Sequence, residues 1–163
     1  MAKITFKGQS EYYEKLKQME EHFLSDEPIE RAVAKGAAPV ADAIRSNLEG
    51  LPDERFRRLY NGDKFLVLSQ AEKNDLSASF GLAPVKKNKS GFIHTKAGFD
   101  GYGSHPTKTY PQGVPNQLVA SAVESGSSVR QKMPFVRPAV NATRKKAVSE
   151  MEKSIDEDLK KIF

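Results

Sequence analysis

The feature that most constrains this chain is a long helical pattern at its C-terminal end. Apolar residues recur at spacings of three, four and seven positions, and charged residues fill the places between them. The recurring residues are Val136, Val140, Ala147, Met151, Ile155, Leu159 and Ile162. This periodicity predicts an amphipathic helix at about 134–162, which at 1.5 Å per residue is about 40 Å long. A small domain covers only part of such a helix, so we expect the rest to be free to meet a partner.

Weaker patterns predict the other elements of a single domain over residues 1–163. Helical spacing of apolar residues predicts helices at about 11–24 and 28–48, and Ser10 is a candidate cap for the first. The second is rich in alanine, which lets another element approach it closely. Residues 50–81 predict loops and short elements, including one or two helical turns from Asp75 that end at Gly81, and Asn61-Gly62-Asp63 is a turn signal.

The rest of the chain adds a small β component. Residues 82–99 predict a β-hairpin with its turn at 87–91, residues 100–114 a long loop, and 115–124 a short helix or strand. These patterns together predict an α+β fold. A small antiparallel sheet, including the hairpin, would pack with two N-terminal helices and the long C-terminal helix.

The charge of the chain is concentrated in its middle. The net charge is +5, but residues 82–146 alone hold 11 Lys and Arg against Asp100 and Glu124. Such a block favours a polyanion or an acidic protein surface, although a solvated basic face is an equally simple interpretation. The candidate contacts to DNA or to an acidic partner are Lys86, Lys87, Lys89, Lys96 and Lys108.

Little in the sequence indicates catalysis, a metal or a cofactor. The chain has no Cys and no nucleophile-elbow pattern, and we find no histidine beside a plausible serine nucleophile. His94, Asp100 and His105 match no compact metal-binding spacing. No apolar run is long enough to cross a bilayer, and the first residues lack the apolar core of a signal peptide. We therefore expect a non-enzymatic protein that is made in the cytoplasm.

One stretch near the C-terminus is specific enough to suggest a family. Glu124-Ser125-Gly126-Ser127-Ser128 is followed by a basic spacer and by Met133-Pro134-Phe135-Val136-Arg137-Pro138-Ala139-Val140. This order resembles the small neck proteins of tailed bacteriophages and prophages, which are called head–tail joining or tail-completion proteins. Gly98-Phe99-Asp100-Gly101-Tyr102 adds to the likeness, whereas Lys73-Asn74-Asp75-Leu76-Ser77 departs from the commonest version of the family.

The resemblance implies a structural part of the virion, with no catalytic residue and no cofactor. It implies a ring of identical subunits, hexameric in a six-fold tail, in the neck between capsid and tail. The other partners would be neck, head-completion and tail-terminator or tail-tube proteins, and DNA passing through the lumen. An alternative from a different class is a sequence-independent nucleic-acid-binding module that uses the basic 82–146 region.

The same stretch supplies the candidate interface residues. These are Arg130, Lys132, Met133, Phe135, Arg137, Pro138 and Val140. Phe135, held between two prolines, suits either the core of its own subunit or a neighbour, and we favour its own core.

Overall fold

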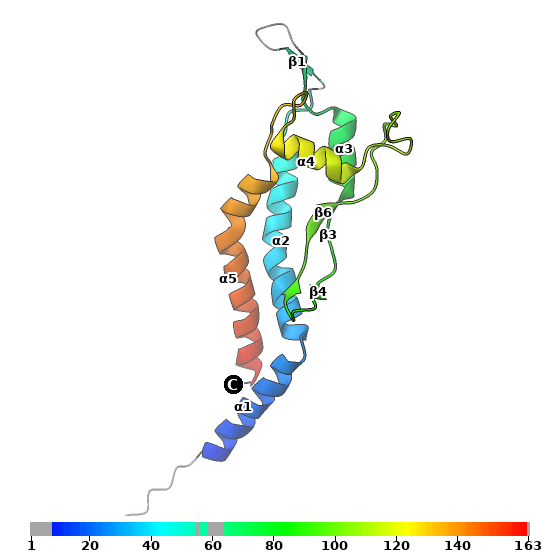
Figure 1. The fold of residues 1–163 in the computed structure, drawn as a ribbon. Helices are drawn as coiled ribbons and strands as arrows, with labels where there is room; N and C mark the ends of the chain where they lie inside the picture. Colours follow the sequence, from blue (N-terminus) through cyan, green and yellow to red (C-terminus); the bar gives the residue numbers. More distant parts are fainter. Residues whose placement is uncertain (1–7, 55, 59–63, 163) are drawn as a thin grey trace, which may run out of the picture.

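The computed structural model describes residues 8–54, 56–58 and 64–162. Over these residues the chain has an α+β fold, as predicted, with five helices and six short strands. Two long antiparallel helices, α2 (Glu27–Glu49) and α5 (Val136–Ile162), form a stalk. Helices α3 (Gln70–Ser79) and α4 (Asn116–Ser125) form a head at one end of the stalk, and α1 (Gln9–Leu24) extends from the other end (Figure 1).

The stalk is narrow because its two helices meet through small residues. Ala32 and Gly36 of α2 and Ala147 and Ser154 of α5 are all buried. A Cβ atom built on Gly36 would lie 2.5 Å from Met151 Cγ and 3.0 Å from the carbonyl oxygen of Ala147. The distance between packed helices depends on the side chains at the contact, so this glycine lets α5 approach α2 more closely than any other residue would.

The face that α5 turns towards α2 coincides only in part with the predicted stripe. The fully buried residues of α5 are Ala139, Ala147, Ser154 and Asp158. Within the predicted stripe Ala147 is buried, Val140 is 41% exposed and the other five residues are partly buried. The predicted stripe follows the larger apolar side chains, whereas the close contact between α2 and α5 mainly buries small ones. One residue of the predicted stripe, Val140, is therefore left exposed.

The strands form three two-stranded antiparallel sheets and not one sheet. β3 (Phe80–Leu82) pairs with β6 (Ala97–Phe99), and β4 (Lys86–Lys87) pairs with β5 (Ile93–His94). These two sheets are successive parts of the predicted hairpin, which starts at Phe80 and lies along α2 (Figure 1). The Asn88 side chain closes the turn by accepting hydrogen bonds from the amides of Ser90 and Phe92.

A third pair, β1 (Phe56–Arg58) with β2 (Lys64–Leu66), falls in the region predicted as short elements. The turn predicted at Asn61-Gly62-Asp63 lies outside the described residues.

Two helix starts also differ from the expected ones. α1 starts at Gln9 after Gly8, which has φ 96°, and no side chain caps it, so Ser10 is not its cap. α3 starts five residues before the predicted Asp75, because Ser69 and Glu72 form a capping box in which each side chain binds the backbone of the other. Gly81 lies in β3 and does not end this helix.

The main core lies in the head. Leu48, Val67, Leu68, Leu76, Val123 and Phe135 are almost completely buried there. Phe99 contacts both Phe80 and Phe135, with ring centroids 5.2 and 5.9 Å apart. The core therefore joins α2, α3, α4 and the hairpin to the start of α5.

Candidate functional site

The residues that carry the family resemblance meet at one place, which we call the junction: residues 124–138, from the end of α4 to the first turn of α5. Its centre is the carboxylate of Glu124. Oε2 accepts hydrogen bonds from the amides of Phe135 at 2.7 Å and Val136 at 2.8 Å, and Oε1 accepts one from the amide of Arg137 at 3.0 Å. A glutamate at the end of one helix thus caps the start of another.

This cap satisfies the start of α5 completely. The first amides of a helix have no partner within the helix, and an anion is favoured at that end. Glu124 binds three of these amides, and the next residue, Pro138, has no amide hydrogen. Burial raises the pKa of Glu124, but the hydrogen bonds from Val136, Arg137 and Phe135 and the charge of Arg137 outweigh it and leave the pKa below its usual 4.5.

Gly126 makes the turn after α4 possible. Its φ is 75°, in the left-handed region that glycine adopts at little cost. A Cβ atom there would lie 2.9 Å from Lys132 Cβ and 3.2 Å from Lys132 N. Ser127 then holds the chain in place, since its hydroxyl accepts hydrogen bonds from the amides of Val129 and Arg130. The glycine and the serine of the motif therefore set the path of the backbone.

Arg130 connects the junction to α3 and to the segment just before it. Its guanidinium donates to the carbonyl oxygen of Val67 and to Glu72 Oε1, both at 2.6 Å, and its side chain is only 11% exposed. The residues before and after Arg130 also form backbone hydrogen bonds with Leu66. Burial raises the pKa of Glu72, but hydrogen bonds from Arg130 and Ser69 and the charge of Arg130 hold it below 4.5.

The structure divides the candidate interface residues into two groups. Met133 is 7% exposed and Phe135 is 0% exposed, so both lie in the core of their own chain. For Phe135 this is the core position that we favoured. The assignment of both side chains to a partner surface is wrong, because a side chain this deeply buried has no surface to offer a neighbour. Arg130 is also held inside the chain by the contacts described above. Lys132, Arg137, Pro138 and Val140 are exposed, and their role at an interface stays a prediction.

The five candidate lysines are all exposed and come from two separate segments of the chain. Lys86, Lys87, Lys89 and Lys96 lie on the hairpin, and Lys108 lies in the loop at 100–114. Lys87 is neutralised by Asp26, with Nζ–Oδ distances of 2.7 and 2.9 Å. The other four have no ion pair within the described part of the chain.

The loop at 100–114 is tied back on itself. The amide of Gly103 binds the carbonyl oxygen of Val114 at 2.8 Å, and the Asn116 side chain donates to the carbonyl oxygen of Asp100. Gly113 has φ 104°, and a Cβ atom there would collide with the backbone of Gly103. This loop is therefore closed at its base by its own backbone.

One cluster near this loop corrects the sequence analysis. Ser104 Oγ lies 2.9 Å from His105 Nδ1 and 2.9 Å from Asp75 Oδ2, so a histidine does lie beside a serine. The order is wrong for a nucleophilic triad, in which the carboxylate orients the histidine and the histidine activates the serine. Here Asp75 binds the hydroxyl and the amide of Ser104 directly. The cluster therefore holds the loop to α3.

Two adjoining grooves lie between the hairpin and α4, and the first of them borders the junction. One, of about 280 Å³, lies between Ile44, Phe80 and Phe99 on its apolar side and Glu124 and Arg137 at its rim. The other, of about 510 Å³, follows the hairpin along residues 81–84 and 96–98. Both are lined by Gln117 of α4. Their polar lining includes Ser121 and Ser125 in the first groove and Lys96 and Asp100 in the second.

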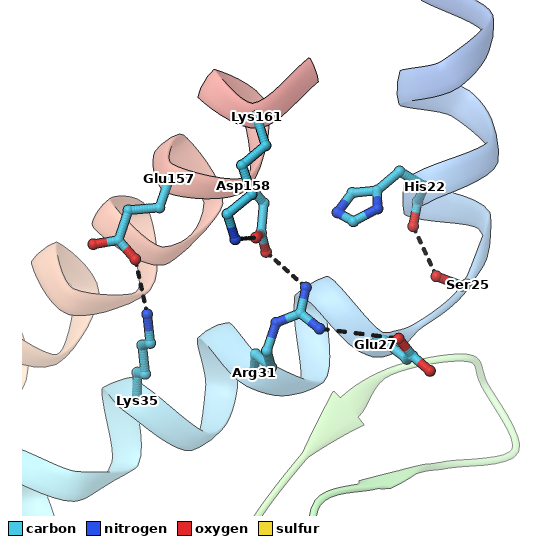
Figure 2. A network of polar contacts seen from close by, with 8 residues as sticks. All are labelled: His22, Ser25, Glu27, Arg31, Lys35, Glu157, Asp158 and Lys161. Carbon is cyan, nitrogen blue, oxygen red and sulfur yellow. Dashed lines mark hydrogen bonds and ion pairs between the residues drawn. The ribbon is translucent and has the colours of Figure 1, made fainter. Parts of the chain in front are cut away.

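The stalk carries a second polar cluster at its far end (Figure 2). Asp158 is buried, and it accepts hydrogen bonds from Lys161 at 2.8 Å and Arg31 at 3.0 Å. These two hydrogen bonds lower its pKa from 3.8 to about 2, against the opposing effect of burial. Lys35 and Glu157 form a further pair at 2.9 Å. The cluster locks the end of α5 to the start of α2.

Other classes of site are not found in the described residues. There, no group of three or more His, Asp or Glu side chains is arranged to hold a metal ion. None of the helices described is both long and apolar enough to cross a membrane. No family model, curated protein or solved structure matches this chain.

Proposed function

We propose that this chain is a non-enzymatic structural subunit of a tailed-phage neck, which joins the capsid to the tail. The observation that supports this most directly is the junction. Glu124, Gly126 and the segment from Phe135 to Pro138 carry the family resemblance, and each has a structural role in directing α5 out of the head. A motif that builds a fold and holds no reacting group is what a structural subunit requires.

The shape of the chain is consistent with assembly. The head contains the main core, while α1 and the outer face of α5 leave apolar side chains in solvent. Tyr12, Tyr13 and Leu24 are 60%, 67% and 73% exposed. A neighbouring subunit that covered them would remove apolar surface from water, at about 25 cal/mol per Å².

The proposal is tested in the phage or prophage that encodes this chain. A stop codon at Glu11 removes the protein, and the lysate is examined by electron microscopy and by plaque assay. We expect DNA-filled heads and separate tails, and restored infectivity when the wild-type chain is supplied from a plasmid. Joined, infectious particles in the absence of the protein would show that the proposal is wrong.

A second candidate function rests on the exposed basic residues. Lys86, Lys89 and Lys96 on the hairpin and Arg144, Lys145 and Lys146 on α5 are all exposed. A nucleic-acid-binding module that used them would hold duplex DNA with an affinity that falls steeply as salt rises. Fluorescence anisotropy with a labelled duplex, from low salt to about 150 mM, measures this. Micromolar or tighter binding at the upper salt concentration, together with normal heads and tails in the lysate, would favour this alternative.

A further inference from the structure

The helix α1 is an arm that the chain itself does not cover. It contacts α2 and α5 where it joins the stalk, and its N-terminal half extends beyond them (Figure 1). Tyr12 and Tyr13 are exposed there, and Leu16 is 36% exposed. An amphipathic helix of 16 residues is marginal in water without a partner for its apolar face. The arm therefore needs a surface to pack on.

The arm is also acidic. It carries Glu11, Glu14, Glu20 and Glu21, all exposed, against Lys15 and Lys17. Its only ion pairs among the described residues are internal, at 3.9 and 4.0 Å, and such exposed pairs contribute little. A partner for this arm should therefore combine apolar contacts with positive charge.

The first half of α5 has these properties. Residues 136–148 contain four basic side chains and no acidic one, whereas the second half of the helix carries five acidic residues. Arg144, Lys145 and Lys146 are exposed and form no ion pair with any described residue. Val140 and Val148 lie two turns apart on this half and are 41% and 48% exposed. We call residues 136–148 the basic strip.

The lengths of the two surfaces match. The arm is about 24 Å long and the basic strip is about 20 Å long, at 1.5 Å per helical residue. Both are regular helices, so one can lie along the other over its whole length with a spacing of about 8–10 Å between axes.

The arm cannot reach the basic strip of its own chain. His22, at the end of the arm, lies beside Asp158 and Lys161 in the last turns of α5 (Figure 2). The nearest end of the strip, Val148, is ten residues further along α5, a distance of about 15 Å. The arm also points away from the head, where the strip lies (Figure 1). Contact between the two surfaces therefore requires two copies of the chain.

We propose that the α1 arm of one copy docks on the basic strip of α5 in a second copy. The two surfaces are different, so the contact is heterologous. Each copy can therefore donate its own arm to one neighbour and receive the arm of another. A contact of this kind generates a ring where the rotation closes, and a filament where it does not. This inference deepens the proposed neck function and rests on it only for the closure of the ring.

The test uses the full-length protein with charges reversed on either surface. The arm variant is Glu11→Lys with Glu14→Lys, and the strip variant is Arg144→Glu with Lys145→Glu. Because like charges facing each other oppose association strongly, each variant alone should weaken self-association by at least about 100-fold. Combining all four substitutions in one chain should restore it. Sedimentation velocity over a range of protein and salt concentrations measures this, with circular dichroism to show that each variant is folded.

The control variant is Glu152→Lys, which reverses one exposed charge on the other half of α5 and should leave association unchanged. A wild-type chain that stays monomeric at every soluble concentration would overturn the proposal. So would a strip variant that associates normally, because the arms would then pair with each other or with another surface. A monomeric chain whose loss still separates heads from tails would refute this contact and leave the neck function standing.

Discussion

Removal of the Glu124 carboxylate should loosen the start of α5 and with it the whole head. In Glu124→Ala the amides of Phe135 and Val136, which are partly buried, lose their acceptor, while the amide of Arg137 is exposed and can bind water. Two such losses at about 1 kcal/mol each, with about 0.5 kcal/mol from the helix dipole, give about 2–3 kcal/mol. For a chain of this size the midpoint of thermal unfolding should fall by about 5–10 °C.

The Glu124→Gln variant removes the charge of the side chain but keeps its shape. The amide keeps one oxygen, which can still accept from Phe135 and Val136, but it offers a donor where the Arg137 amide needs an acceptor. We expect a loss of about 1 kcal/mol, between the wild type and Glu124→Ala. Urea unfolding followed by circular dichroism measures all three proteins, and Glu152→Gln on the exposed face of α5 is the matched control. The control should stay within about 0.5 kcal/mol of the wild type.

The pH dependence follows from the direction of the pKa shift. The pKa of Glu124 in the folded chain is below 4.5, its usual value, so the carboxylate contributes stability that is fully present above pH 4.5. That contribution is lost as pH falls through the lower, folded pKa. The difference between the wild type and Glu124→Gln should therefore be constant near neutral pH and shrink below pH 4.5. A Glu124→Ala protein within about 0.5 kcal/mol of the wild type, or a difference that does not change with acid, would refute the capping role.

Three further substitutions test the stalk and the junction. Gly36→Ala places a methyl group against Met151. The cost of overpacking, about 1–3 kcal/mol, should exceed the gain of about 1 kcal/mol in helix propensity. Urea unfolding should therefore show a net loss of stability. Asp158→Asn should lower the midpoint of thermal unfolding by several degrees at pH 7. Because the hydrogen bonds of the carboxylate lower its pKa to about 2, that difference should fade as pH drops from 3.8 towards 2 in thermal scans. In Arg130→Lys the ammonium group cannot reach two acceptors as the planar guanidinium does. The free energy of unfolding, measured in urea, should therefore fall by about 1–3 kcal/mol. A stability equal to that of the wild type would contradict the role of Arg130.

The regular elements could be predicted from the sequence because their signals are local. The long helices start and end within two residues of the expected positions, and the hairpin at 82–99 is present. The start of α3 has an equally local signal, since Ser69 and Glu72 have the spacing of a capping box. Local patterns thus carry most of the secondary structure.

The face of α5 and the role of Glu124 could not be obtained in this way. Which side of α5 is buried depends on Gly36 and Ala32 of α2, more than a hundred positions away in the chain. Glu124 caps amides eleven to thirteen residues further along, across a turn whose path is set by Gly126. Sequence spacing marked this stretch as important, but only the backbone path shows which atoms meet.

The residues that carry the resemblance have a structural role that is distinct from the binding of partners. Glu124, Gly126 and Phe135 form their contacts within the chain, so they are not available to a neighbour. Residues that are recognisable in sequence because the fold requires them need not be the ones that choose a partner. The two surfaces of the proposed contact, the α1 arm and the basic strip of α5, have ordinary helical patterns with no distinctive motif. The motif residues therefore support the fold of the chain, and in the proposed contact the charges of the exposed helices select the partner.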